Sequence, residues 1–266
     1  IFFRVRTAFS WRPSRRGPRT HSPAAMPLHI HVVQHAKAYT GGMIEDWAHA
    51  HRHKYTSTHL WVSDAHLPAV NQFDWLVLVG GPLPAAEGLS TAWVLEELTL
   101  VKEAIQQDKV VIGMGQGAQL IASALGAGVV QNEQGPEIGW FPVKFTDVAR
   151  HPRVFPFLPD ELVVFHGHAN TFQLPLGAKL LASSSACHNQ AFLYENRVLA
   201  MQFHLEWTEE DVQNVLPQVQ NTIQPGKYMQ SVSTILAGKD VYVPLMREAL
   251  NKILDRMVEF NDFLDL

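Results

Sequence analysis

Two apolar segments that end near a glycine constrain the fold of this chain more than any other feature. They are "DWLVLVGGP" at residues 74–82 and "KVVIGM" at residues 109–114. A strand that is apolar on both faces belongs at the centre of a parallel sheet covered by helices. Residues 91–107 lie between them and place apolar side chains at helical spacing: Val94, Leu98, Val101 and Ile105. The strand–helix–strand order therefore predicts an α/β fold with a mostly parallel sheet.

The segments on either side of this unit extend the same alternation. Residues 29–35 predict a first strand, residues 42–54 a helix and residues 58–62 a second strand. Residues 117–125 predict a helix with Gly126 as its C-terminal cap.

The C-terminal half contains shorter runs of alternating apolar residues. Residues 161–168 predict a strand, and residues 190–195 and 197–204 predict a hairpin that turns near Glu195 and Asn196. A final helix carries its apolar side chains on one stripe: Met246, Leu250, Ile253, Met257 and Phe260. We therefore expect one three-layer α/β domain over residues 26–266, with its mostly parallel central sheet flanked by helices.

The first 25 residues differ from the rest of the chain. They contain six of the 21 basic residues and no acidic residue, and the first methionine is Met26. We expect a disordered basic tail, and both an organelle-targeting segment and translated upstream sequence fit it. Residues 26–266 then hold 15 basic against 25 acidic residues. This acidic body argues against nucleic acid as a partner.

Composition restricts the location and the cofactor chemistry. No apolar run is long enough to cross a bilayer, and Cys187 is the only cysteine, which excludes an intramolecular disulfide. We expect a cytoplasmic protein with no membrane contact. His49 and His53 stand four apart on the predicted helix, a spacing at which two imidazoles can share a metal, but no third ligand is suggested nearby. The sequence therefore predicts no metal and no cofactor.

The glycine-rich turn in "VVIGMGQGAQLIASALG", residues 110–126, allows two interpretations. Gly113, Gly115 and Ala118 match the G-x-G-x-x-G/A dinucleotide pattern, with the acidic Glu133 about twenty positions after it. This unit is not the first strand–helix–strand of the domain, which weakens the dinucleotide interpretation.

The second interpretation is a nucleophile elbow, a strand-to-helix bend that exposes one side chain beside backbone N–H groups. Such a site needs a base. His204 ends a predicted strand, and Glu206 two residues later can orient the imidazole from the same side.

Several linked motifs favour the elbow. The chain from Met26 resembles the class I, triad-type glutamine amidotransferases, and is most similar to their stand-alone, GMP-synthase-like members. The resemblance rests on five segments in the expected order: "VLVGGP", "GMGQGAQLIASALG", "FHGHANTF", "ASSSACHNQAF" and "LAMQFHLEWT".

In that family the elbow reads G-x-C-x-G-x-Q, and its cysteine attacks the glutamine amide to form a thioester and release ammonia. Gly113, Gly117 and Gln119 match this motif, but Gly115 stands at the cysteine position. Glycine offers no nucleophile, so the resemblance implies an impaired or inactive amidotransferase.

The resemblance also implies roles for other residues. His204 would be the base and Glu206 its orienting carboxylate, the backbone of Gly81 and Gln116 would form the oxyanion hole, and Gln119 would lie near the bound glutamine. The implied ligand is glutamine or a related small amide, and the implied partner is a synthetase or acceptor domain. An active amide or γ-glutamyl hydrolase that uses water activated by His204 stays open as an alternative.

This sequence departs from the family pattern at positions beside the site. Leu205 stands where proline is frequent, Gly167 where tryptophan is frequent and Asn170 where aspartate is frequent. His166 and His168 are expected on one face of their strand in a hydrogen-bonding role. Cys187 is expected to be structural.

Overall fold

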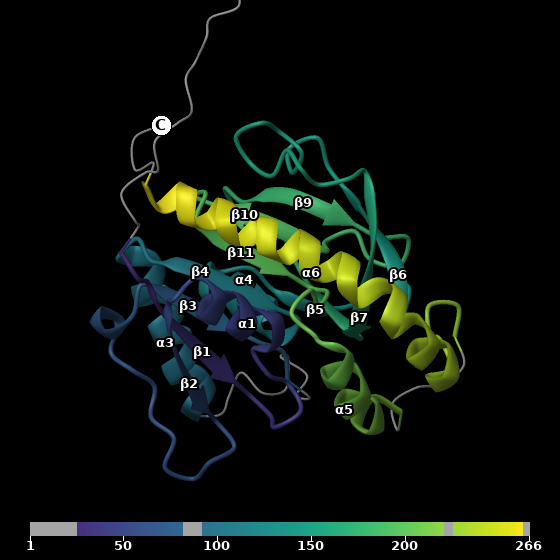
Figure 1. The fold of residues 1–266 in the computed structure, drawn as a ribbon, viewed down its shortest axis with the longest axis horizontal. Coiled ribbons are helices and arrows are strands. Elements are labelled where there is room, and N and C mark those ends of the chain that lie inside the picture. The colour runs from purple at the N-terminus through teal and green to yellow at the C-terminus, as the bar shows by residue number, and fades with distance from the viewer. Residues whose placement is uncertain (1–25, 82–91, 221–225, 263–266) are drawn as a thin grey trace, which may run out of the picture.

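The computed structural model describes residues 26–81, 92–220 and 226–262 (Figure 1). The predicted tail of residues 1–25 lies outside the described residues, so its nature stays a prediction.

Eleven strands lie within the described ranges. In chain order they are β1 His29–Gln34, β2 Lys54–His59, β3 Trp75–Leu78, β4 Val110–Met114, β5 Val129–Gln131, β6 Glu137–Phe145, β7 Glu161–His168, β8 Asn170–Phe172, β9 Lys179–Ser183, β10 Ala191–Tyr194 and β11 Val198–Met201. The α-helices are α1 Gly42–Ala50, α3 Ala92–Gln106, α4 Gln116–Ala124, α5 Glu209–Gln220 and α6 Val232–Asp262.

Nine of these strands form the central sheet, in the order β2-β1-β3-β4-β11-β10-β9-β6-β7. The neighbours from β2 to β11 are parallel, and those from β11 to β7 are antiparallel. The two remaining strands, β5 and β8, pair separately. Every residue of β3 and β4 is buried, as the apolar runs predict.

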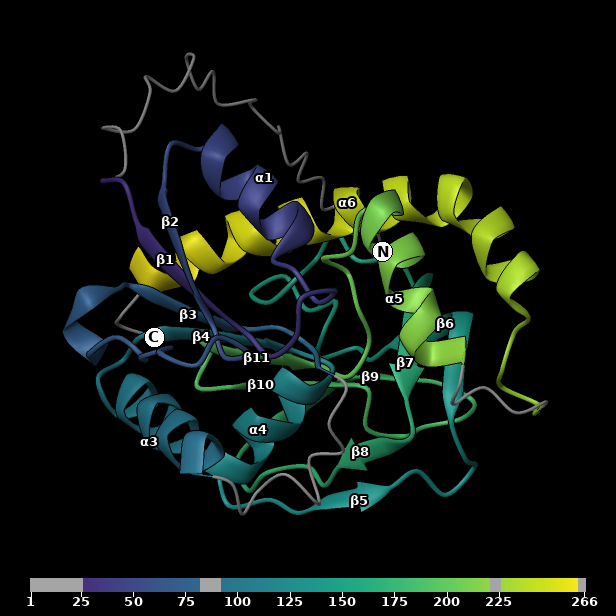
Figure 2. The ribbon, with the colours of Figure 1, turned by 90° about the horizontal axis from the view of Figure 1, so that it is seen from below.

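Helices cover both faces of the sheet. Figure 2 shows α1 and α6 on one side of the strands and α3 and α4 on the other. Each side has its own apolar cluster. The stripe of α6 is buried at Met246, Leu250, Ile253 and Met257, and the helix runs across the sheet in Figure 1. The predicted three-layer α/β fold is confirmed.

The turn chemistry agrees with the predicted hairpin and helix end. Glu195 and Asn196 both have positive φ, +48° and +58°, as the two central residues of a type I′ turn require, and the Arg197 N–H closes this turn on the Tyr194 carbonyl at 3.3 Å before β11 begins. Gly126, at φ +85°, follows the end of α4 in the left-handed region.

The boundaries between α1 and β2 were predicted wrongly. The helix ends at Ala50, and the strand begins at Lys54 because Lys54–His59 pairs in register with β1. This strand lies at the sheet edge, where polar residues are tolerated, so it lacks a clear apolar pattern. His49 and His53 therefore do not share a helix, and the His53 ring accepts a hydrogen bond from the Leu28 N–H.

No helix among residues 26–81, 92–220 and 226–262 has both the length and the apolar character needed to span a membrane.

Candidate active site

The sheet order brings Gly115 and His204 together. Strands β4 and β11 are parallel neighbours, with Met114 opposite Met201, and both end at the same edge of the sheet. Gly115 follows β4, and its N–H donates a hydrogen bond to the Met201 carbonyl at 2.9 Å. His204 lies three residues beyond the end of β11. Two segments almost ninety positions apart thus meet at one point.

The backbone of Gly115 has the conformation of a nucleophile elbow. Its φ of +55° and ψ of −116° are unfavourable for residues with a side chain. A Cβ atom built on Gly115 would lie 2.9 Å from His204 Cε1 and 3.0 Å from His204 Nε2. Any side chain at position 115 would therefore start directly against the imidazole.

The two flanking glycines are required by packing. A Cβ on Gly113 would lie 2.6 Å from the Gly117 carbonyl carbon, and one on Gly117 would overlap the Leu78 carbonyl oxygen. The glycines let α4 approach β3 and β4 closely. After α4 the chain enters β5, which pairs with β8 outside the central sheet, so this turn does not open a βαβ unit. The dinucleotide interpretation therefore lacks the strand–helix–strand unit that it requires.

His204 is held rigidly by its neighbours. Its Nδ1–H donates to Glu206 Oε1 at 2.6 Å, and its ring stacks on Trp207 with centroids 3.8 Å apart. Its backbone N–H donates to the Phe165 carbonyl at 2.9 Å. Within the part of the chain that the structure describes, Nε2 makes no hydrogen bond. The arrangement leaves the Nε2 lone pair free to act as a base beside position 115.

The predicted oxyanion residues also meet. Gly81 follows β3 and Gln116 begins α4, and a Cβ on Gly81 would overlap Gln116 Oε1. Neither backbone N–H donates to an acceptor among the described residues. The N-terminal end of α4 adds a positive potential at the same place. These groups can stabilise negative charge on an amide oxygen.

Gln119 lies one helical turn after the elbow and is buried. Its Nε2 donates to Gln202 Oε1 at 3.0 Å and to the Asn170 carbonyl at 3.3 Å. Gln119 therefore belongs to a polar cluster between α4, β8 and the segment after β11.

A second buried histidine–carboxylate pair lies beside Gly81. His35 Nδ1 lies 2.9 Å from the Val79 carbonyl, and its Nε2 lies 3.0 Å from both carboxylate oxygens of Glu97. Both ring nitrogens face acceptors, so the ring is an imidazolium. Burial opposes this charge, but the attraction of the Glu97 carboxylate and the hydrogen bond that it accepts from His35 outweigh burial and raise the pKa of His35. The sequence analysis did not find this pair.

Cys187 does not replace the missing nucleophile in this geometry. It lies in the loop between β9 and β10, where its Sγ donates to Thr171 Oγ1 at 3.2 Å. Burial raises the pKa of its thiol, which disfavours the reactive thiolate. These contacts support a structural role.

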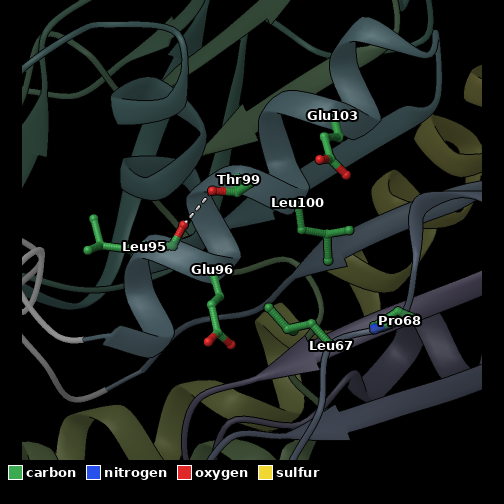
Figure 3. A pocket seen from close by; sticks show the side chains of 7 residues that line it. All are labelled: Leu67, Pro68, Leu95, Glu96, Thr99, Leu100 and Glu103. Carbon is green, nitrogen blue, oxygen red and sulfur yellow. Dashed lines mark hydrogen bonds between the residues drawn. The ribbon is translucent and has the colours of Figure 1, made fainter.

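The pocket in Figure 3 lies away from these residues. Leu67 and Pro68 face α3 there, and the Thr99 hydroxyl donates to the Leu95 carbonyl at 2.8 Å. The residues that line it are Leu67, Pro68, Leu95, Glu96, Thr99, Leu100 and Glu103. None of the candidate site residues is among them.

Comparison with known proteins identifies the family. The model of the glutamine amidotransferase class-I family matches residues 40–218. The chain belongs to the class I glutamine amidotransferases. The amidotransferase-like protein YfeJ of Salmonella typhimurium is 28% identical over 234 residues, which cover 86% of this chain and 97% of YfeJ.

Two further proteins are similar to this member of the amidotransferase family. Gamma-glutamyl peptidase 4 of Arabidopsis thaliana is 26% identical over 153 residues, which cover 56% of this chain and 60% of the peptidase. The crystal structure of a glutamine amidotransferase from Thermotoga maritima has a TM-score of 0.78 at 24% identity and covers 88% of this chain and 100% of its own. The structural likeness supports the shared fold.

Proposed function

We propose that this chain binds glutamine or a related small amide at the Gly115–His204 site, and that it is impaired in hydrolysing it. The observation that carries the proposal is the position of the absent side chain: a Cβ on Gly115 would lie 3.0 Å from His204 Nε2. His204, Glu206 and the N–H groups of Gly81 and Gln116 support the proposal as base, orienting carboxylate and oxyanion donors, and the atom that would attack the amide is missing.

The chemical consequence follows from the order of events in the family's reaction. A cysteine thiolate must first form a thioester as the C–N bond breaks and ammonia leaves, and water then releases glutamate. Without the thiol, only direct attack by water remains. Loss of the nucleophile in a comparable triad costs about 10⁶-fold in kcat, although donors and binding retain part of the catalysis.

The same replacement suits a binding protein. Glycine adopts the elbow conformation without the strain that a cysteine would carry there. The site could then serve as a glutamine-responsive subunit of a synthetase or acceptor enzyme. This partner, and a cytoplasmic location, are part of the proposal.

The test restores the nucleophile. Ammonia release from glutamine is measured for the wild type, Gly115→Cys and Gly115→Ala, with glutamine binding followed by calorimetry. We expect binding by the wild type, large activity only in Gly115→Cys, and none in Gly115→Ala, which introduces the same Cβ without a thiol. Comparable ammonia release by the wild type and Gly115→Cys would contradict the impaired-enzyme proposal.

A second candidate is a hydrolase in which His204 activates water. It is favoured by the free Nε2 lone pair and by the similarity to a protein named as a gamma-glutamyl peptidase. In that case the wild type cleaves a γ-glutamyl dipeptide, and His204→Ala abolishes the cleavage. Absence of cleavage in the folded wild type would remove this candidate.

A further inference from the structure

Three buried side chains with metal-ligand chemistry meet on one face of β6 and β7. Glu137 lies directly opposite His168 in the antiparallel pair, and His166 lies two residues before His168 on the same face. All three are buried, and one ligand atom from each lies within 4.8 Å of the other two. None of them belongs to the Gly115–His204 site.

One ring nitrogen of each histidine is hydrogen-bonded to a backbone carbonyl. His168 Nδ1 lies 3.0 Å from the Asn170 carbonyl, and His166 Nε2 lies 3.3 Å from the Phe141 carbonyl. The other ring nitrogen of each histidine, His166 Nδ1 and His168 Nε2, faces Glu137.

Both nitrogens lie close to the same carboxylate oxygen. His168 Nε2 lies 3.2 Å and His166 Nδ1 lies 3.4 Å from Glu137 Oε2. His168 Nε2 has no hydrogen-bond partner of good geometry among the described residues. By contrast, His35 makes well-formed hydrogen bonds to Glu97. Two ring nitrogens and a carboxylate oxygen, which are atoms that can each bind a metal ion, thus converge in a buried place.

We propose that Glu137, His166 and His168 bind a divalent transition-metal ion, with zinc as the best match. Two imidazole nitrogens and one carboxylate oxygen are a common zinc ligand set. Ligands at about 2.0–2.2 Å from a tetrahedral zinc lie roughly 3.3–3.5 Å from one another, which agrees with the distances to Glu137 Oε2. Backbone carbonyls that orient the second ring nitrogen are typical of metal-bound histidines.

Neighbouring side chains support the ligands and offer access. Gln190 Nε2 and Ser184 Oγ donate to Glu137 Oε2 at 2.7 and 3.1 Å and hold the carboxylate. Gln190 Nε2 also lies 3.5 Å from His166 Nδ1, a weak contact that the metal would replace. Rotation of this amide would present its oxygen as a further ligand. Ser184 also lines a polar pocket of about 670 Å³, which offers an entry path.

This proposal departs from the sequence-based expectation of no metal. Strand alternation places His166 and His168 on one face, but the third ligand comes from β6, about thirty residues earlier. The metal site does not depend on the proposed amide binding, because the two sites share no residue.

The test uses the full chain purified without a histidine tag and stripped with a chelator. Zinc binding is measured by calorimetry and by metal analysis, and cobalt(II) is added as a spectroscopic probe. We expect one metal per chain, visible ligand-field bands of nitrogen and oxygen ligands without thiolate bands, and a higher Tm with zinc. Glu137→Gln and His168→Gln should each weaken binding at least 100-fold.

Matched variants separate this site from other ligands. Cys187→Ser removes the nearby thiol, and His49→Gln removes a histidine outside the cluster, so both should keep one metal per chain. Far-UV circular dichroism checks that each variant is folded. Failure of the folded wild type to bind zinc or cobalt saturably would overturn the proposal, as would unchanged affinity in folded Glu137→Gln and His168→Gln.

Discussion

Two buried histidine–carboxylate pairs, His204–Glu206 and His35–Glu97, contain the same groups but form different hydrogen bonds. His35 uses both ring nitrogens as donors, to the Val79 carbonyl and to Glu97. His204 uses only Nδ1, and its Nε2 faces the empty position beside Gly115. The His35–Glu97 pair is therefore closed, because both ring nitrogens are hydrogen-bonded. The His204–Glu206 pair is open, because one ring nitrogen stays available.

The difference also appears in what each pair connects. Glu97 lies on α3 and His35 follows β1, so their hydrogen bond joins α3 to the sheet beside Gly81. Glu206 lies two residues from His204 and orients a ring without joining distant elements. Removing one partner of a buried ion pair destabilises the fold, whereas an oriented imidazole with one free nitrogen is suited to proton transfer.

The largest expected effect concerns the open pair. In the Gly115→Cys background, His204→Ala should lower ammonia release by about 10²–10⁴-fold, the usual contribution of a general base. A steady-state ammonia assay measures the loss. If Gly115→Cys is active and His204→Ala leaves its rate unchanged, His204 is not the base and the distinction between the two pairs fails.

The closed pair should matter more for stability than the open one. Glu97→Ala leaves a buried imidazolium without its carboxylate and should lower the free energy of unfolding by about 3–5 kcal/mol. Glu206→Ala leaves the Nδ1–H of His204 without its acceptor and should cost about 1–3 kcal/mol. Denaturant unfolding compares the two variants, and equal losses would contradict the distinction between the two pairs.

A smaller effect is expected at the elbow. Gly115→Ala should lower the free energy of unfolding by about 1–2 kcal/mol through its positive φ, plus a contribution from the contact of its Cβ with His204. Gly126→Ala is the matched control, because Gly126 has φ +85° and nothing within 4 Å of its Cβ position. Equal losses in thermal or denaturant unfolding would show that the His204 contact costs nothing.

The smallest expected effect is a pH dependence of the closed pair. Folding raises the pKa of His35, so the pair stabilises the fold fully below the unfolded-state pKa, near 6.5, and loses this contribution as the pH rises through the folded-state pKa. The stability difference between wild type and Glu97→Gln should therefore shrink between pH 6 and pH 9 in denaturant titrations. A difference that grows with pH would reverse the assigned sign.

Local patterns allowed much of the fold to be predicted. The apolar runs that became β3 and β4, the stripe of α6 and the two-residue turn before β11 were all visible because burial and turn conformation depend on nearby residues. Strand β6 was not predicted, since Gly139 and Pro142 interrupt its pattern. The edge strand β2 was misplaced because its side chains are mostly polar.

The closed pair shows what a local pattern misses. Glu97 lies three residues after Val94 and four before Val101, on the buried stripe of α3, and a charged residue there could have signalled a buried partner. The partner's identity was not visible, because His35 is 62 positions earlier.

The sequence by itself determined that the chain alternates strands and helices, that it carries the amidotransferase motifs and that position 115 has no side chain to attack an amide. Only the tertiary structure decided which histidine meets which carboxylate. Whether position 115 can supply a nucleophile is decided by the identity of that residue, whereas hydrogen bonding between distant side chains depends on strand order and register. The same residue types therefore became a closed ion pair, an open base and a candidate metal site.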